Sequence, residues 1–178
     1  MANDIGHDAG YVLESRAVYI FAGMGDLFLS ILLAALALLL VSAGIEDVRA
    51  RTIANWKNAA IALMAPLWWW ASGMGWGDMG VQLAIALVVL ALFALAFALR
   101  QMGGGDVKLI AALALWLPLQ PLVWMLLVMA VAGGALTLAM VIEKHVRRST
   151  RPIEIPYGVA IVFAALLTLG EPIFNHLS

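Results

Sequence analysis

The chain has 178 residues, of which 65% are hydrophobic and 12% charged, whereas soluble domains carry about 25% charged residues. This composition excludes a soluble globular domain and favours an integral membrane protein. The net charge of −1, without a large basic patch, argues against nucleic acid as a partner. The absence of cysteine excludes disulfides and a cysteine nucleophile, and the 3 histidines have no metal-ligand spacing, so we expect neither a metal nor a cofactor.

Six apolar runs follow one another along the chain and predict transmembrane helices over residues 27–45, 59–77, 79–99, 109–117, 123–142 and 155–170. A run of about 20 apolar residues is long enough to cross the hydrocarbon core, and two of the runs are shorter. We predict an all-α integral membrane protein, with a segment of uncertain structure over residues 1–25 and a six-helix domain over residues 26–178. The first residues lack the basic region of a secretory signal peptide, so no cleaved signal is expected.

Basic residues predict which way the helices face. Nine of the 10 Lys and Arg residues fall in the segments 49–57, 100–108 and 144–151. If all six runs cross, these segments share one side, which the positive-inside rule makes cytoplasmic, and both termini are extracytoplasmic. If the run 109–117 did not cross, the segment 144–151 would lie opposite the other two, so we predict that it crosses. Glu46 and Glu143, at inner span ends, are expected to be solvated or to pair with nearby Lys and Arg.

Tryptophans lie near several predicted span ends. Trp76, Trp116 and Trp124 are predicted to anchor the outer ends of their helices at the membrane interface. The run 68–70, three consecutive tryptophans, has no functional interpretation and is expected to pack against lipid or another helix.

The pattern Gly-x-Gly-Asp occurs three times, ending at Asp26, Asp78 and Asp106. On the predicted topology only Asp106 lies on the same side as Asp47, which follows the first span. Two carboxyl groups held close together can share one proton, so that the charged one draws a proton from water while the protonated one polarises a carbonyl. This pair predicts an aspartic hydrolase that cuts membrane-anchored peptides. The alternative is a plain loop in which Asp106 is the N-cap of the next helix.

Three glycines, Gly103, Gly104 and Gly105, directly precede Asp106. Because they lack a Cβ atom, they would let an extended peptide approach the backbone beside the acid. The following run, 107–118, is about 18 Å long as a helix, against a hydrocarbon core of about 30 Å. This mismatch predicts either a thinned membrane or a helix that begins below the surface in a polar cleft.

Three local sequences resemble motifs of the bacterial type IV prepilin peptidases, an integral-membrane aspartic group. Residues 47–56 (DVRARTIANW) resemble D-x-R-x-x-x-I-P-N, residues 103–109 (GGGDVKL) resemble G-x-G-D-x-K-L, and residues 155–160 (IPYGVA) resemble I-P-Y-G-x-A. The resemblance covers about residues 26–170. It implies catalysis by Asp47 and Asp106, with substrate binding or motif support from Gly103, Gly104, Gly105, Lys108, Asn55, Pro156, Tyr157 and Gly158.

For function, the resemblance implies cleavage of the basic leader of a pilin precursor at the cytoplasmic face of the bacterial inner membrane, usually after a glycine and without a cofactor. The implied partners are the membrane-anchored precursor, the lipid bilayer and pilus-assembly machinery. Ala54 stands where the family often has proline. The chain has neither cysteine nor room for the cytoplasmic insertion of the larger bifunctional members. It therefore resembles the short, peptidase-only branch that serves tight-adherence (Flp-type) pili, and methyl transfer is not expected.

Three alternatives use the same residues. A presenilin-like or signal-peptide-peptidase-like enzyme shares G-x-G-D, but it pairs this motif with Tyr-Asp and Pro-Ala-Leu sequences that this chain does not contain. A transporter or channel would place ionisable groups near the middle of the membrane, and no predicted span has one there. A non-catalytic assembly factor would be indicated by the loss of either acid, and both acids are present.

Overall fold

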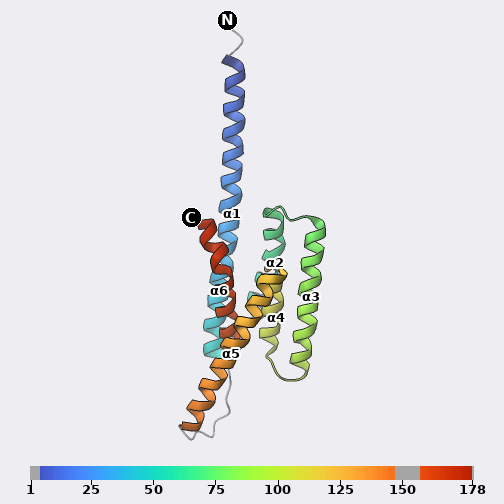
Figure 1. The fold of residues 1–178 in the computed structure, drawn as a ribbon, viewed down its shortest axis with the longest axis vertical. Coiled ribbons are helices and arrows are strands. Elements are labelled where there is room, and N and C mark those ends of the chain that lie inside the picture. The colour runs from blue at the N-terminus through green and yellow to red at the C-terminus, as the bar shows by residue number, and fades with distance from the viewer. Residues whose placement is uncertain (1–4, 147–156, 178) are drawn as a thin grey trace.

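The computed structural model describes residues 5–146 and 157–177, in which helices are the only regular elements (Figure 1). The all-α prediction is therefore confirmed. In chain order the helices are α1 (Ile5–Ala50), α2 (Asn55–Ala71), α3 (Trp76–Ala98), α4 (Gly104–Ala114), α5 (Leu119–Val146) and α6 (Tyr157–Leu177).

Three stretches within these helices are long and apolar enough to cross a membrane, namely Gly25–Ala50, Trp76–Ala98 and Leu119–Glu143. They identify a membrane protein. The apolar parts of the other helices are shorter. Helix α2 has 17 residues, α4 has 11, and the apolar part of α6 is Tyr157–Gly170. The six-span topology with both ends outside, and the boundaries of the two predicted segments, stay predictions.

Helix α4 lies at the centre of the bundle and contacts α2, α3 and α6, while α6 also packs against α1 and α5 (Figure 1). Seven of the 11 residues of α4 are buried, whereas α3 buries only 3 of its 23 residues. Helix α4 is therefore enclosed by protein. Helix α3 presents most of its apolar surface outward, as a helix facing lipid does.

The short length of α4 leaves carbonyl groups at its end that need partners. Eleven residues of helix extend about 17 Å, and backbone outside a helix is tolerated in an apolar layer only where protein or water satisfies it. The Gln82 amide donates to the Ala114 and Leu117 carbonyls at 2.6 and 2.7 Å, and Trp69 Nε1 donates to the Leu115 carbonyl at 2.8 Å. Side chains from two neighbouring helices thus take the place of a further helical turn.

The tryptophans divide into exposed and buried groups. Trp76 and Trp124 are 90% and 57% exposed, as interfacial residues would be, but Trp116 is only 6% exposed. Trp116 Nε1 donates to the Ile61 carbonyl at 2.9 Å, and its ring centroid lies 5.8 Å from that of Trp68. The prediction of an interfacial anchor is therefore wrong for Trp116, because the chain turns back after α4 and folds this side chain into the bundle.

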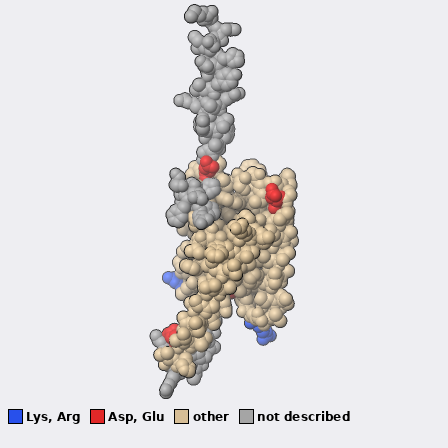
Figure 2. Space-filling model, viewed as in Figure 1, with Lys and Arg blue, Asp and Glu red and all other residues tan. Residues whose placement is uncertain are grey.

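Charged side chains lie towards the two ends of the bundle. In Figure 2 the visible Lys and Arg side chains lie in the lower half of the molecule, and acidic side chains are visible near the upper end of the described part and also at its lower left. The turn between α3 and α4 lies at the lower end as well (Figure 1). This distribution agrees with the charge pattern in the sequence, although the structure itself contains no membrane.

The hydrogen bond from Trp69 to the end of α4 is expected to stabilise the fold measurably. Trp69→Phe leaves the Leu115 carbonyl without its donor and should lower the free energy of unfolding by about 1–2 kcal/mol. The matched control is Trp70→Phe, since Trp70 is 77% exposed and its replacement should change stability by less than about 0.5 kcal/mol. Thermal unfolding in detergent measures both, and equal effects would contradict the role given to Trp69.

Candidate active site

Asp47 lies in the last turn of α1 and is 5% exposed. Its Oδ2 atom accepts a hydrogen bond from the Val159 backbone N–H at 3.3 Å, and the Gly158 N–H donates to the same carboxyl group. Helix α6 begins at Tyr157, so these donors are the N–H groups of its first turn. Because such groups have no partner within the helix and carry partial positive charge, they hold the carboxylate in place.

Gly158 permits this contact because it has no side chain. A Cβ atom at position 158 would lie 2.7 Å from both Cγ and Oδ2 of Asp47, closer than real side chains approach. The neighbouring Tyr157 packs its ring against Gly133 of α5, where an added Cβ would lie 3.3 Å from the ring. Two of the predicted support residues thus lie beside the first acid, while Pro156 lies outside the described residues.

Asp106 is the third residue of α4 and is 9% exposed. The N-cap of this helix is Gly103, and the Asp106 carboxyl group reaches back to accept a hydrogen bond from the Gly103 N–H. The alternative in which Asp106 itself is the N-cap is therefore wrong. A carboxylate at this third position can still satisfy the free N–H at the helix start, as in a capping box.

The structure brings Asp47 and Asp106 close enough for their charges to interact. Asp106 precedes the predicted fourth span and lies outside the three candidate spans. Burial, followed by the negative charge of Asp47, raises the pKa of Asp106 to about 6, although the hydrogen bond from Gly103 opposes this rise. Such a pair can hold one shared proton.

The other two Gly-x-Gly-Asp aspartates are elsewhere. Asp26 precedes Asp47 by 21 residues in α1, which corresponds to about 32 Å of helix. Asp78 lies in the first turn of α3, at the end of that helix away from the turn leading to Asp106. Both side chains are exposed. Of the three motif aspartates, Asp106 is the one placed beside Asp47.

Contacts between the starts of α2 and α4 connect the two acidic motifs. Gly105 approaches Ile53 so closely that an added Cβ would lie 3.4 Å from the Ile53 backbone nitrogen. The Asn58 Nδ2 donates to the Gly105 carbonyl at 3.1 Å, and Lys108 Nζ donates to Asn55 Oδ1 at 2.8 Å. The sequence motifs indicated Asn55, Gly105 and Lys108 but did not include Asn58. The available signal was its place one helical turn after Asn55, as a polar residue in an apolar run.

Glu46 connects the end of α1 to the turn after it and to α2. Its Oε2 atom lies 2.9 Å from Lys57 Nζ and accepts the Ala54 N–H at 3.2 Å. Lys57 is 7% exposed and also donates to the Ser42 carbonyl at 3.0 Å. The predicted pairing of Glu46 with a nearby cation is confirmed. This pair links α1, the turn and α2, so it supports the position of Asp47.

An open cavity of about 770 Å³ lies beside Asp106. Its lining residues come from the end of α3, the turn that follows and the starts of α4 and α6, and they are Phe97, Ala98, Arg100, Gln101, Met102, Gly103, Asp106 and Tyr157. Of the three consecutive glycines, Gly103 alone belongs to this lining, because Gly104 packs against the Phe97 ring and Gly105 against Ile53. Gly104 and Gly105 therefore contribute to helix packing, and Gly103 is the glycine that borders the cavity.

Shortly after α1 and α3 end, an arginine takes up a left-handed backbone conformation, Arg51 with φ 55° and Arg100 with φ 58°. This conformation costs an L-residue other than glycine about 1 kcal/mol and turns the chain sharply. The N–H of Arg51 donates to the Asp47 carbonyl at 2.9 Å, and the N–H of Arg100 donates to the Phe97 carbonyl at 2.9 Å. These turns direct the chain from Asp47 into α2 and from α3 towards Asp106.

The type IV leader peptidase family matches residues 31–138, which include both aspartates and most of the bundle. The chain belongs to this family. Membership implies aspartic endopeptidase activity and prepilin substrates. Comparisons with curated proteins and with solved structures find no significant match.

The site uses carboxyl groups and backbone donors. Among the side chains that the structure describes, within residues 25–143, 145–146 and 157–170, no three His, Asp or Glu lie close enough to hold a metal ion. The expectation that the leader peptidase needs neither metal nor cofactor stays a prediction.

The contact between Asp47 and Gly158 generates a direct test. Gly158→Ala forces the carboxyl group away from its donors, and because a displacement of about 1 Å can cost about 100-fold in rate, cleavage should fall by about that factor. Gly170→Ala is the matched control in the same helix, since a Cβ there meets nothing within 4 Å. Rates of leader release by the two purified variants measure the difference, and full activity of Gly158→Ala would exclude the contact.

Proposed function

We propose that this leader peptidase uses Asp47 and Asp106 to remove the leader of a membrane-anchored pilin precursor. One observation carries the proposal, namely the placement of two buried carboxyl groups from separate helices, α1 and α4, within range of each other's charge. Backbone N–H groups hold both of them, and the cavity beside Asp106 is large enough for a short extended peptide.

The proposed reaction begins with one proton shared by the pair. Ionised Asp47 takes a proton from water as the water oxygen adds to the scissile carbonyl carbon, and protonated Asp106 donates its proton to the carbonyl oxygen. The resulting tetrahedral diol returns a proton to Asp106 as the carbon–nitrogen bond breaks. Asp47 passes its proton to the leaving nitrogen. The products are a carboxylic acid and an amine, and no covalent intermediate with the protein forms.

The proposed setting is the cytoplasmic face of a bacterial inner membrane. Support comes from the basic segments after α1 and α3, whose neighbouring residues Asn55 and Lys108 are joined directly. The finer assignment is to the peptidase-only branch that serves tight-adherence (Flp-type) pili, without methyl transfer. It rests on the absence of cysteine from this sequence. Family membership favours this function over the presenilin-like, transporter and assembly-factor alternatives.

Replacing either acid tests the proposal. Asp47→Asn and Asp106→Asn should each reduce leader release by at least about 100-fold, the lower range for losing a general acid or base. The assay uses purified protein and a pilin-like precursor, with a metal chelator present and S-adenosylmethionine absent. Asp26→Asn and Asp78→Asn, which alter exposed acids elsewhere, are the matched controls. Substantial cleavage by either of the first two variants would refute catalysis by the pair.

The pKa of Asp106 predicts how activity changes with pH. Because this pKa is raised to about 6, the shared proton is lost as pH rises, and kcat/KM should fall about tenfold per pH unit well above 6. A rate that stays constant from pH 6 to pH 9 would contradict the shared proton.

The stability of the folded protein should also depend on the protonation of Asp106. The folded-state pKa of Asp106 is raised, so the folded protein loses stability as pH rises from the unfolded value near 4 through about 6. Asp106→Asn removes the buried like charge and should be more stable than the unaltered protein at pH 8, by on the order of 2 kcal/mol. The difference should vanish near pH 4. Thermal unfolding at both pH values measures it and also shows that the inactive variant is folded.

A further inference from the structure

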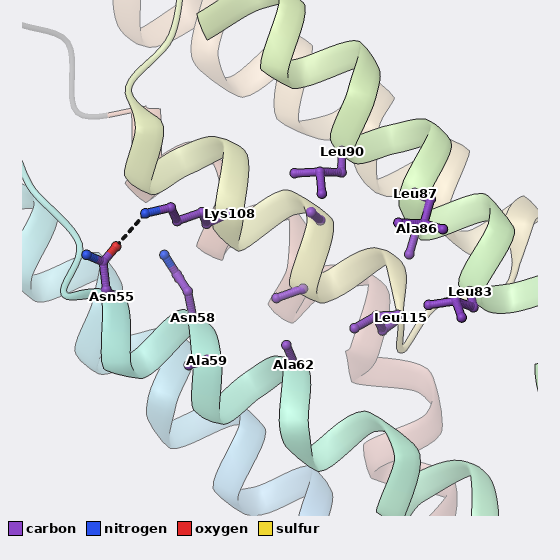
Figure 3. A pocket seen from close by; sticks show the side chains of 12 residues that line it. Asn55, Asn58, Ala59, Ala62, Leu83, Ala86, Leu87, Leu90, Lys108 and Leu115 are labelled. Carbon is purple, nitrogen blue, oxygen red and sulfur yellow. Dashed lines mark hydrogen bonds between the residues drawn. The ribbon is translucent and has the colours of Figure 1, made fainter.

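A second concave site lies on another face of α4. Figure 3 shows a groove whose floor is α4 and whose walls are α2 and α3, and its volume is about 420 Å³. It shares no lining residue with the cavity beside Asp106. Its middle is lined by small side chains, among them Ala62 and Ala86, and Leu83, Leu87 and Leu90 of α3 form one wall (Figure 3). The groove is therefore apolar over most of its length.

Polar groups gather at one end of this groove, where Figure 3 shows Asn55, Asn58 and Lys108 together. Lys108 is the one charged residue in the groove lining. Its ammonium group has three N–H donors, and one of them binds Asn55 Oδ1. Asn58 is 4% exposed, and its Oδ1 atom has no hydrogen-bond partner within the described part of the chain. A buried acceptor without a donor is costly.

These features indicate a ligand with an apolar tail and an anionic group. We propose that the groove binds one acyl chain of an anionic phospholipid, such as phosphatidylglycerol, with its phosphate beside Lys108. The positive charge of Lys108 has no carboxylate beside it in the groove lining, so it is complementary to a phosphate. This binding is independent of the proposed peptidase reaction.

The size of the groove distinguishes an acyl chain from a transmembrane helix of the precursor. A helix is 10–12 Å wide with its side chains, so three turns occupy about 1,300–1,800 Å³. The groove offers about 420 Å³, which accommodates a single hydrocarbon chain, whereas a helix would contact it with one face only.

The proposed ligand would also contact the support of the active site. Asn58 Nδ2 donates to the Gly105 carbonyl, directly before Asp106, and Lys108 follows Asp106 by two residues. A phospholipid held by Lys108 therefore stabilises the start of α4. Since it binds the folded chain, it should raise the temperature of unfolding.

The test uses the purified full-length protein, freed of lipid in detergent. Thermal unfolding is measured with added phosphatidylglycerol or with phosphatidylcholine of identical acyl chains. The anionic lipid should stabilise the protein more, with an apparent affinity for phosphatidylglycerol about fivefold higher than for phosphatidylcholine. Native mass spectrometry should show one retained phosphatidylglycerol. Ala62→Phe fills the groove and should abolish both effects, while Ala94→Phe, at an exposed α3 position outside the groove lining, should preserve them.

A second variant keeps the test decisive if Ala62→Phe does not fold. Lys108→Met removes the charge but not the apolar lining, so the two lipids should then bind equally. Equal binding of the two lipids to the unaltered protein, or retained phosphatidylglycerol in Ala62→Phe, would overturn the proposal. A photo-cross-linker at Leu87 that captures the precursor helix instead of lipid would overturn it too. Asp47→Asn, inactive under the proposed function, should respond to lipid normally, so the two proposals fail separately.

Discussion

The arrangement of this protein depends on the contact between the Asp47 carboxylate and the backbone at the start of α6. The end of α1 and the beginning of α6, more than 100 residues apart in sequence, meet at this point, and the two N–H donors come from Gly158 and Val159. A side chain at position 158 would occupy the place of the carboxyl group. Because α6 also packs against α4, fixing Asp47 on α6 determines where the first acid lies relative to Asp106.

Helix α4 supplies the second acid and can do so because it is short. Its start lies against the turn after Asp47, through Gly105 and Ile53, and its end receives hydrogen bonds from Gln82 and Trp69. Protein encloses both ends, so an 11-residue helix is stable within an apolar bundle. The same enclosure buries Asp106 and gives it a raised pKa.

Holding two like charges together in this way destabilises the fold, and neighbouring contacts offset the cost. The Lys57–Glu46 pair joins α2 to α1, which carries Asp47, and the Asn55–Lys108 hydrogen bond joins α2 to α4, which carries Asp106. The apolar groove beside Asn58 and Lys108 adjoins the same segments. Lipid binding there and peptide cleavage at the two acids would therefore act on one structural element from different sides.

The sequence alone determined the helical membrane class, because long apolar runs have few other stable structures. It also predicted the candidate acids, since the charge pattern predicts that Asp47 and Asp106 lie on one side, and it indicated Gly158 through a motif resemblance. The tertiary structure decided the roles of Asn58, Trp69 and Trp116. Each donates to a carbonyl 46 to 55 residues away in sequence. No local pattern encodes such pairs, because they depend on where separate helices cross and which backbone groups are left without partners when α4 ends early.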